Sequence, residues 1–301
     1  MLNSAWPSNM WHLFDYYYQV GGSGFGAKKA CSSAVHLLYS YPSQADNDHE
    51  TSNGYVWAVN SRYTPSDAGL VAEATQFELD GTVVKKLQTP ITEPLESDGV
   101  RRLMPLDLYP KPDDNNADGN ASVAAAAART ETILVRLRLT SGGDSETAAV
   151  IEDNWYWLPP KLDKFEMGGC FTGCDIDRFA NMRDIVDMPS APALVVTVGD
   201  PTPAQDGLVS HTVKLKAADA DERGAWLAFF VRLRALDADG KDVLPATWSD
   251  NFVSLQAGES VELTLEHEAD AVVDKVVAKA FNAPSPDETS GGHTVEKQDT
   301  V

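Results

Sequence analysis

The feature that most limits the possible folds is an apolar residue at every second position over residues 132–139. Four apolar side chains fall at every second position and share one face of an extended chain: Ile133, Val135, Leu137 and Leu139. Arg136 and Arg138 point the other way. A period of two does not suit a helix, so the segment predicts a half-buried β-strand.

Other segments repeat this strand-type pattern. Three more strands are expected at residues 35–41, 55–60 and 72–79. The third of these runs into Asp80-Gly81, a hairpin turn signal, and residues 82–87 follow as its expected partner. Short strands and turn signals without a long helical pattern indicate a mainly β fold.

Two segments recur farther along the chain at nearly one offset. FVRLRAL, which begins at Phe230, resembles LVRLRL, which begins at Leu134, at an offset of 96 positions. DNFVSL, from Asp250, resembles DNWYWL, from Asp153, at an offset of 97 positions. The common order suggests two related modules of roughly a hundred residues, and we predict two immunoglobulin-like β-sandwiches.

Composition shifts divide the chain further. The segment MPSAPA at residues 188–193 contains two prolines and is the expected junction between the sandwiches. Residues 111–129 combine a polar run with an alanine run and predict a disordered insertion, and the polar residues 284–301 predict a disordered tail.

The N-terminal segment differs from the rest, because Pro7 precedes apolar residues at helical spacing. Met10, Trp11, Phe14 and Tyr17 fall on one face and predict a short amphipathic helix. Four glycines between residues 21 and 26 then end any regular element.

The sequence of this segment resembles a known family. MLNSAWPSNMWHLFDYYYQ, followed by GFGAKKACSSAVHLLYSY, is similar to the end of the barrel and the first ancillary strand of exo-β-D-glucosaminidases of glycoside hydrolase family 2. DNWYWLP at residues 153–159 and WSDNFVSLQAGES at residues 248–260 are similar to segments of the β-sandwiches that follow that barrel. The resemblance therefore implies the C-terminal portion of such an enzyme.

The resemblance also implies where the catalytic residues of the enzyme lie. Enzymes of this family remove terminal glucosamine from chitosan oligosaccharides with two carboxylates on a (β/α)8 barrel, held about 5 Å apart for a retaining mechanism. Those carboxylates precede the matched segment, so we expect no catalytic residue in this chain. Asn3 and Trp6 would lie at the barrel rim, as candidate contacts to the sugar beside their role in closing the barrel.

These expectations define four segments. Residues 1–30 form the barrel remnant and linker, residues 31–188 the first sandwich, residues 189–283 the second sandwich and residues 284–301 the tail. In the complete enzyme the missing barrel would pack on residues 1–18. Two alternatives stay open: a fragment of a β-mannosidase-like relative, and a stand-alone, non-catalytic carbohydrate-binding β-sandwich protein.

Charge narrows the range of partners. The 45 Asp and Glu residues exceed the 24 Lys and Arg residues and give a formal net charge of -21, which disfavours nucleic acid as a partner.

No apolar stretch reaches the length of about 18 residues that a membrane span needs. Localisation is open, with an extracellular location expected if the complete precursor carries a signal peptide.

Neither cofactor nor metal is expected. Cys170 and Cys174 have no neighbouring histidine or third cysteine to complete a zinc site, so we expect a loop disulfide or free thiols, and Cys31 stands alone. The six histidines show no paired spacing.

Three consecutive aromatic residues suit either core packing, the interpretation we favour, or a platform for sugar stacking: Trp155, Tyr156 and Trp157.

Overall fold

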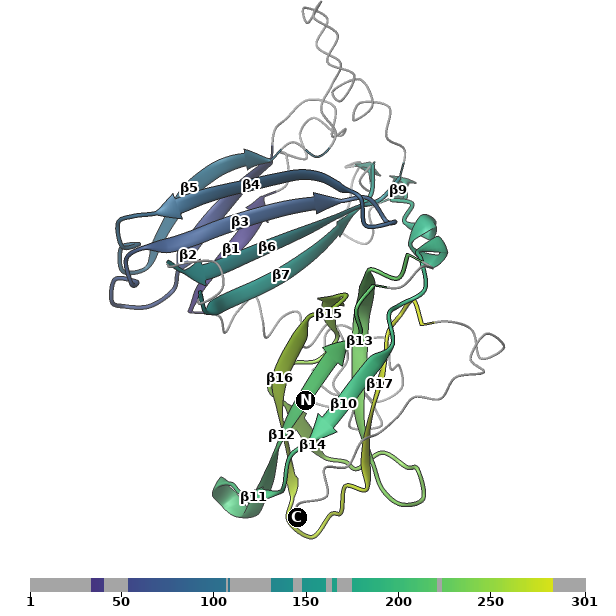
Figure 1. The fold of residues 1–301 in the computed structure, drawn as a ribbon. Coiled ribbons are helices and arrows are strands. Elements are labelled where there is room, and N and C mark those ends of the chain that lie inside the picture. Colours follow the sequence, from purple (N-terminus) through teal and green to yellow (C-terminus); the bar gives the residue numbers. More distant parts are fainter. Residues whose placement is uncertain are drawn as a thin grey trace, which may run out of the picture. The chain divides into compact units, whose positions relative to one another are not determined.

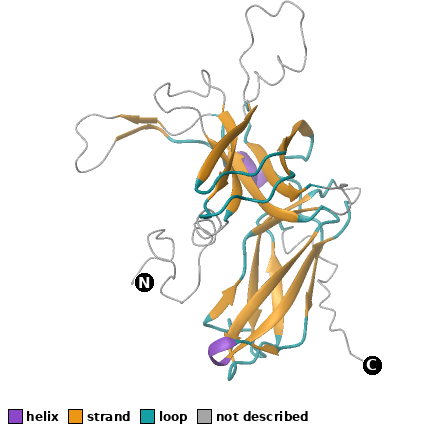
Figure 2. Cartoon of the chain, turned by 90° about the vertical axis from the view of Figure 1, so that its left-hand side faces the viewer, coloured by secondary structure: helices purple, strands orange, loops and turns teal. Residues whose placement is uncertain are grey.

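The structure is a computed structural model that describes part of the chain: residues 34–40, 54–106, 108, 131–142, 148–160, 164–166, 175–220 and 224–283. The described residues form two compact units, one within residues 33–188 and the other within residues 189–283. Strands make up most of the regular structure in the described residues, as Figure 2 shows in orange. Among them, no helix combines the length and apolar character needed to cross a membrane.

The first unit contains a three-stranded and a four-stranded antiparallel sheet (Figure 1). The order of the three-stranded sheet is β1 (Val35–Ser40), β2 (Gly54–Asn60) and β5 (Gly99–Leu106). The order of the four-stranded sheet is β4 (Val83–Ile91), β3 (Leu70–Phe77), β6 (Ile133–Ser141) and β7 (Val150–Leu158). The chain passes from one sheet to the other after β2, after β4 and after β5. This connectivity gives a Greek-key sandwich of the immunoglobulin type. A small hairpin of β8 (Lys164–Glu166) and β9 (Asp175–Arg178) follows.

The core of the first unit lies between its two sheets. Alternate side chains of β1 and β2 are buried, as the period of two requires, and Leu37, Val56 and Ala58 are at most 1% exposed. The inward side chains of β6 meet them from the opposite sheet. Dispersion contacts and removal of apolar surface from water therefore hold the two sheets together.

The predicted hairpin is confirmed. β3 and β4 pair antiparallel from Leu70 opposite Ile91 to Phe77 opposite Val83. Gly81 adopts a φ of 94°, which favours glycine, and the Asp80 carboxylate accepts a hydrogen bond of 2.8 Å from the Thr82 N–H. The Asp-Gly signal thus specifies the turn that joins the two strands.

The second unit is also a sandwich of two sheets. The order of its first sheet is β10 (Leu194–Val198), β12 (Leu208–Ala217), β16 (Ser260–Glu268) and β14 (Ala246–Trp248), with β11 (Thr202–Pro203) paired to β12. The order of the second sheet is β15 (Val253–Gln256), β13 (Leu227–Leu236) and β17 (Lys275–Lys279). Two short 3-10 turns complete the described elements, η2 (Arg183–Asp187) in the first unit and η3 (Gln205–Gly207) in the second.

The two sequence echoes do not mark equivalent strands. β6, which contains the first copy of the LVRLRL-type segment, is the sixth strand of its unit and lies between β3 and β7. β13, which contains the second copy, follows only β10, β11 and β12 and lies between β15 and β17. Both copies of the LVRLRL-type segment lie in the middle of a sheet, whereas the DNWYWL segment lies on the edge strand β7 and the DNFVSL segment leads into the edge strand β15.

Several predictions concern residues outside the described part of the chain. They include the barrel remnant at residues 1–30, the insertion at residues 111–129, the tail at residues 284–301, and Cys31, Cys170 and Cys174. These stay predictions.

Candidate functional site

A cluster of charged side chains lies on the outward face of the four-stranded sheet of the first unit. In the register of that sheet, Arg136 on β6 is opposite Trp155 on β7, and Arg138 is opposite Asp153. On the other side of β6, Glu73 of β3 is opposite Arg138. Neighbouring rungs of one face therefore bring a carboxylate, two guanidinium groups and an indole together.

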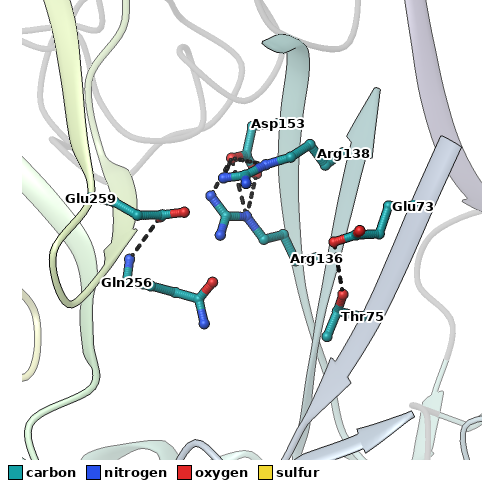
Figure 3. Close-up of polar contacts among 7 residues, drawn as sticks. All are labelled: Glu73, Thr75, Arg136, Arg138, Asp153, Gln256 and Glu259. Carbon is teal, nitrogen blue, oxygen red and sulfur yellow. Dashed lines mark hydrogen bonds and ion pairs between the residues drawn. The ribbon is translucent and has the colours of Figure 1, made fainter. Parts of the chain in front are cut away.

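Asp153 is the centre of this cluster. Its carboxylate accepts hydrogen bonds of 2.9 and 3.1 Å from Nε of Arg136, a further bond from Nη2 of Arg136, and one of 3.0 Å from Nη2 of Arg138 (Figure 3). The two arginines thus share one carboxylate, and a pair that involves a planar guanidinium fork is directional as well as charged.

The electrostatics of the cluster keep Asp153 ionised. Burial by itself would raise the pKa of the Asp153 carboxyl, but the hydrogen bonds and positive charges of Arg136 and Arg138 outweigh it and hold that pKa below its ordinary value. A carboxylate in this state accepts hydrogen bonds and does not release a proton near neutral pH. The chemistry of the cluster is therefore that of an ion pair rather than of a general acid.

Trp155 covers one side of the cluster. Its ring stacks on Phe77, with centroids 5.7 Å apart and planes inclined by 26°, and Cζ of Arg136 lies 5.0 Å from the Trp155 ring centroid. Its indole Nε1 is buried and has no hydrogen-bond partner among the described residues.

The three aromatic residues of β7 have different roles. Tyr156 points to the opposite face, packs against the core and accepts a hydrogen bond from the Tyr39 N–H, whereas the outward Trp157 is 36% exposed. Core packing, the favoured reading, describes Tyr156. Trp155 and Trp157 do not belong to the core between the sheets.

The outward face itself corrects the prediction of a half-buried strand. Leu134 and Arg136, both on the face of β6 opposite the core, are 0% and 4% exposed, and Phe77 of β3 is 3% exposed. An outward sheet face ordinarily stays wet. Alternation alone does not distinguish a covered face from a wet one, and here the arginine is buried because its charge is paired and its guanidinium is hydrogen-bonded.

Two smaller polar contacts appear in Figure 3. Thr75 donates a hydrogen bond of 3.3 Å to Glu73, whose other oxygen lies 2.9 Å from Nζ of Lys86. In the second unit, considered separately, the Gln256 N–H donates to the Glu259 carboxylate at 3.0 Å. That bond fixes the turn between β15 and β16.

None of the site residues predicted from the sequence is a member of this cluster. Asn3 and Trp6 lie outside the described residues. The predictions did not assign Arg136 and Asp153 to a site, although both occur in the segments that drew attention, LVRLRL and DNWYWL. Within the described ranges, no three His, Cys, Asp or Glu side chains come together as a possible metal site.

Comparison with known proteins shows which family this chain resembles. Residues 172–283 match the family model described as the exo-beta-D-glucosaminidase Ig-fold domain. This range includes the whole second sandwich and the last part of the first unit.

Similarity extends beyond that domain. An exo-β-D-glucosaminidase of Streptomyces avermitilis is 30% identical over 270 residues, which is 89% of this chain and 26% of that protein. One from Hypocrea jecorina is 26% identical over 87% of this chain and 25% of its own length. The crystal structure of Amycolatopsis orientalis exo-chitosanase CsxA matches with a TM-score of 0.69 and 26% identity, over 91% of this chain and 28% of CsxA. The chain thus spans about a quarter of the length of these relatives, and the predicted resemblance to exo-β-D-glucosaminidases is confirmed.

Proposed function

Because the chain is homologous to exo-β-D-glucosaminidases, which are glycoside hydrolases, we propose that it is the ancillary β-sandwich part of such an enzyme and carries none of its catalytic carboxylates. The observation that supports this most strongly is the match to CsxA, which extends over 91% of this chain but only 28% of CsxA. Two sandwiches without a barrel among the described residues agree with an ancillary role.

The complete enzyme would hydrolyse the O-glycosyl bond of terminal β-linked glucosamine in chitosan oligosaccharides. Retaining hydrolysis needs an acid/base and a nucleophile about 5 Å apart on rigid elements, and the ends of barrel strands provide such elements. The sandwiches would stabilise and shape that barrel. Their rigid cores suit this task, since a small displacement of catalytic groups is costly to the rate.

The N-terminal segment is the proposed point of attachment. Residues 1–18 would form the last strand and helix of the barrel, and the rest of the barrel would pack on them. In this arrangement Asn3 and Trp6 lie at the rim of the sugar site, where an amide and an indole suit hydroxyl groups and pyranose faces respectively.

Activity measurements test the proposal. The purified chain should release no p-nitrophenol from p-nitrophenyl β-D-glucosaminide above a buffer blank. A chimera of the Streptomyces avermitilis enzyme, with its matching quarter replaced by this chain, should hydrolyse the substrate, whereas that enzyme without the quarter should not. Turnover by the chain alone would refute the absence of catalytic residues, and a folded but inactive chimera would refute the ancillary role.

The chimera also tests the sugar-rim residues. Asn3→Ala in the chimera should raise KM several-fold with a smaller change in kcat, because a ground-state contact to the sugar is lost. An unchanged KM would remove Asn3 from the substrate site.

Neither alternative is favoured by the comparisons. All five curated relatives carry the name exo-β-D-glucosaminidase.

The proposal of a missing barrel has a physical consequence that also separates it from a stand-alone binding protein. Without a barrel, the apolar side chains of the first segment would be left against water: Trp6, Met10, Trp11, Leu13 and Phe14. The isolated chain should therefore self-associate in light scattering, and the variant with Trp11→Glu and Phe14→Glu should be a monomer. A monomeric wild type would contradict the missing-barrel proposal.

A further inference from the structure

The second sandwich contains a close contact between two buried histidines that the proposed function does not use. Nε2 of His211 on β12 lies 3.1 Å from Nε2 of His267 on β16. The rings are inclined by only 19°, and their centroids are 5.2 Å apart. His211 is 8% and His267 is 4% exposed. The rings therefore face each other through one nitrogen each, with little access for water.

The register of the strands explains the contact. His211 pairs with Leu265, and His267 pairs with Val209 on β12 and Ala246 on β14, so the two histidines are diagonal neighbours on one face. That face is the inner one, since Val213, Leu215 and Leu265, at alternate positions, belong to the core.

The other nitrogen of each ring is committed to a backbone carbonyl. Nδ1 of His211 lies 3.1 Å from the Gly199 oxygen, and Nδ1 of His267 lies 2.8 Å from the Glu268 oxygen. A carbonyl oxygen only accepts, so each Nδ1 must be the donor and carry a hydrogen.

This assignment fixes the proton count at the contact. A neutral imidazole has one N–H, and if that N–H is at Nδ1, then Nε2 has a lone pair. Two neutral rings would oppose two lone pairs at 3.1 Å, which is a repulsive contact at a hydrogen-bond distance. One additional proton on either Nε2 converts it into an N–H···N hydrogen bond. We propose that His211 and His267 form a one-proton binding site in which an imidazolium donates to a neutral imidazole.

The surroundings hold no competing charge in contact with the rings. Among the described residues, the polar partners of both rings are each other and the two carbonyls. The charged residues of the two strands alternate with the histidines and lie on the outward face of the sheet: Lys214, Lys216, Glu262, Glu266 and Glu268. β10 and β14 carry no charged residue.

The opposite sheet also presents apolar positions to the core. Leu233 and Ala235 of β13 and Val276 of β17 are buried in it, while Arg232 and Lys275 alternate with them and are exposed. The proton would therefore be held by the pair itself and by the two carbonyl dipoles, not by a neighbouring carboxylate.

A metal ion is the alternative ligand, since a ligating histidine also donates its second N–H to a carbonyl. Metal sites usually need further ligands, and no third His, Cys, Asp or Glu joins the pair in the described part of the chain. These observations favour the proton.

Nuclear magnetic resonance tests the proposal on the full chain labelled with ¹⁵N-histidine. Long-range ¹H–¹⁵N spectra near neutral pH should show both Nδ1 atoms protonated and one proton shared by the two Nε2 atoms. Two unprotonated Nε2 atoms, or one unprotonated Nδ1, would overturn the proposal. A spectrum that changes on treatment with a metal chelator would assign the site to a metal instead.

A variant gives a second readout. His211→Gln offers an amide N–H to His267 without a titratable group, so the Nε2 of His267 should then be a pure acceptor with an unprotonated ¹⁵N shift. Retention of an intermediate, shared-proton shift in His211→Gln would contradict the pair. The wild-type spectrum decides the question even if this variant does not fold.

Discussion

The hydroxyl of Tyr156 on β7 accepts a hydrogen bond of 3.2 Å from the backbone N–H of Tyr39 on β1. The two strands are edges of different sheets. Two residues earlier on β1, the Leu37 N–H donates to the Glu152 carboxylate of β7 at 2.6 Å. Side chains of β7 thus take the place of a neighbouring strand for the open edge of β1, and they tie the two sheets of the first sandwich together.

The first prediction concerns the hydrogen bond between the Tyr39 N–H and the Tyr156 hydroxyl. Tyr156→Phe should lower the free energy of unfolding of the first sandwich by about 1–3 kcal/mol, because the Tyr39 N–H loses its acceptor in a site with little water. Tyr63→Phe is the matched control, since Tyr63 is 93% exposed, and it should change nothing measurable. Urea unfolding of both variants checks this, and equal midpoints would contradict it.

Periodicity in the sequence predicts the strands well but not the partners of their polar side chains. The alternation at residues 132–139 identifies β6, and Asp80-Gly81 identifies the β3–β4 turn, because these signals are local. His211 and His267 are 56 positions apart and meet only through the register of β12 with β16. No spacing rule for adjacent residues contains that information.

Burial of charge was the other point that the sequence left open. Arg136 and Arg138 occupy equivalent positions in the alternating pattern, yet Arg136 is 5% and Arg138 27% exposed at the side chain. Arg136 lies opposite Trp155, whose ring its guanidinium approaches, whereas Arg138 lies opposite Asp153. The apolar and polar pattern of a single strand predicts neither the cross-strand neighbours of a side chain nor which face of the sheet is covered.

The second prediction follows from that difference. Arg136→Met should destabilise the first sandwich by about 2–3 kcal/mol, because it removes the more buried partner of Asp153 while Arg138 still pairs with that carboxylate. Arg138→Met should cost less, about 1 kcal/mol, because the Arg138 side chain is 27% exposed and Asp153 keeps its bonds to Arg136. Unfolding in urea measures both, and a similar loss in the two variants would show that burial of Arg136 is not the deciding factor.

The third prediction concerns pH. The pKa of Asp153 is held below its ordinary value in the folded chain, so its ionised form contributes stability that is fully present above the unfolded pKa of about 3.9. That contribution is lost as the pH falls through the lower, folded pKa. Wild type should therefore be more stable than Asp153→Asn at about pH 6, and the difference should shrink below about pH 4. A difference that grows in acid would reverse the sign of this linkage.

The last prediction concerns a side chain that continues a sheet where the backbone ladder stops. Asn251, which is 6% exposed, accepts a hydrogen bond of 2.8 Å from the Leu233 N–H and donates one of 3.1 Å to the Leu233 carbonyl. It therefore satisfies both backbone groups of a residue in β13 that lies beyond the last paired position of β15, Val231 opposite Val253.

Asn251→Ala leaves both groups of Leu233 without these partners, so we expect a loss of about 2 kcal/mol or more in the second sandwich. The Leu233 amide should also exchange with solvent deuterium much faster than in wild type, because its protection depends on the Asn251 oxygen. Asn181→Ala is the control, since the bond that Asn181 accepts from the Arg183 N–H is exposed. Unchanged exchange at Leu233 would mean that the side chain does not hold this end of the sheet.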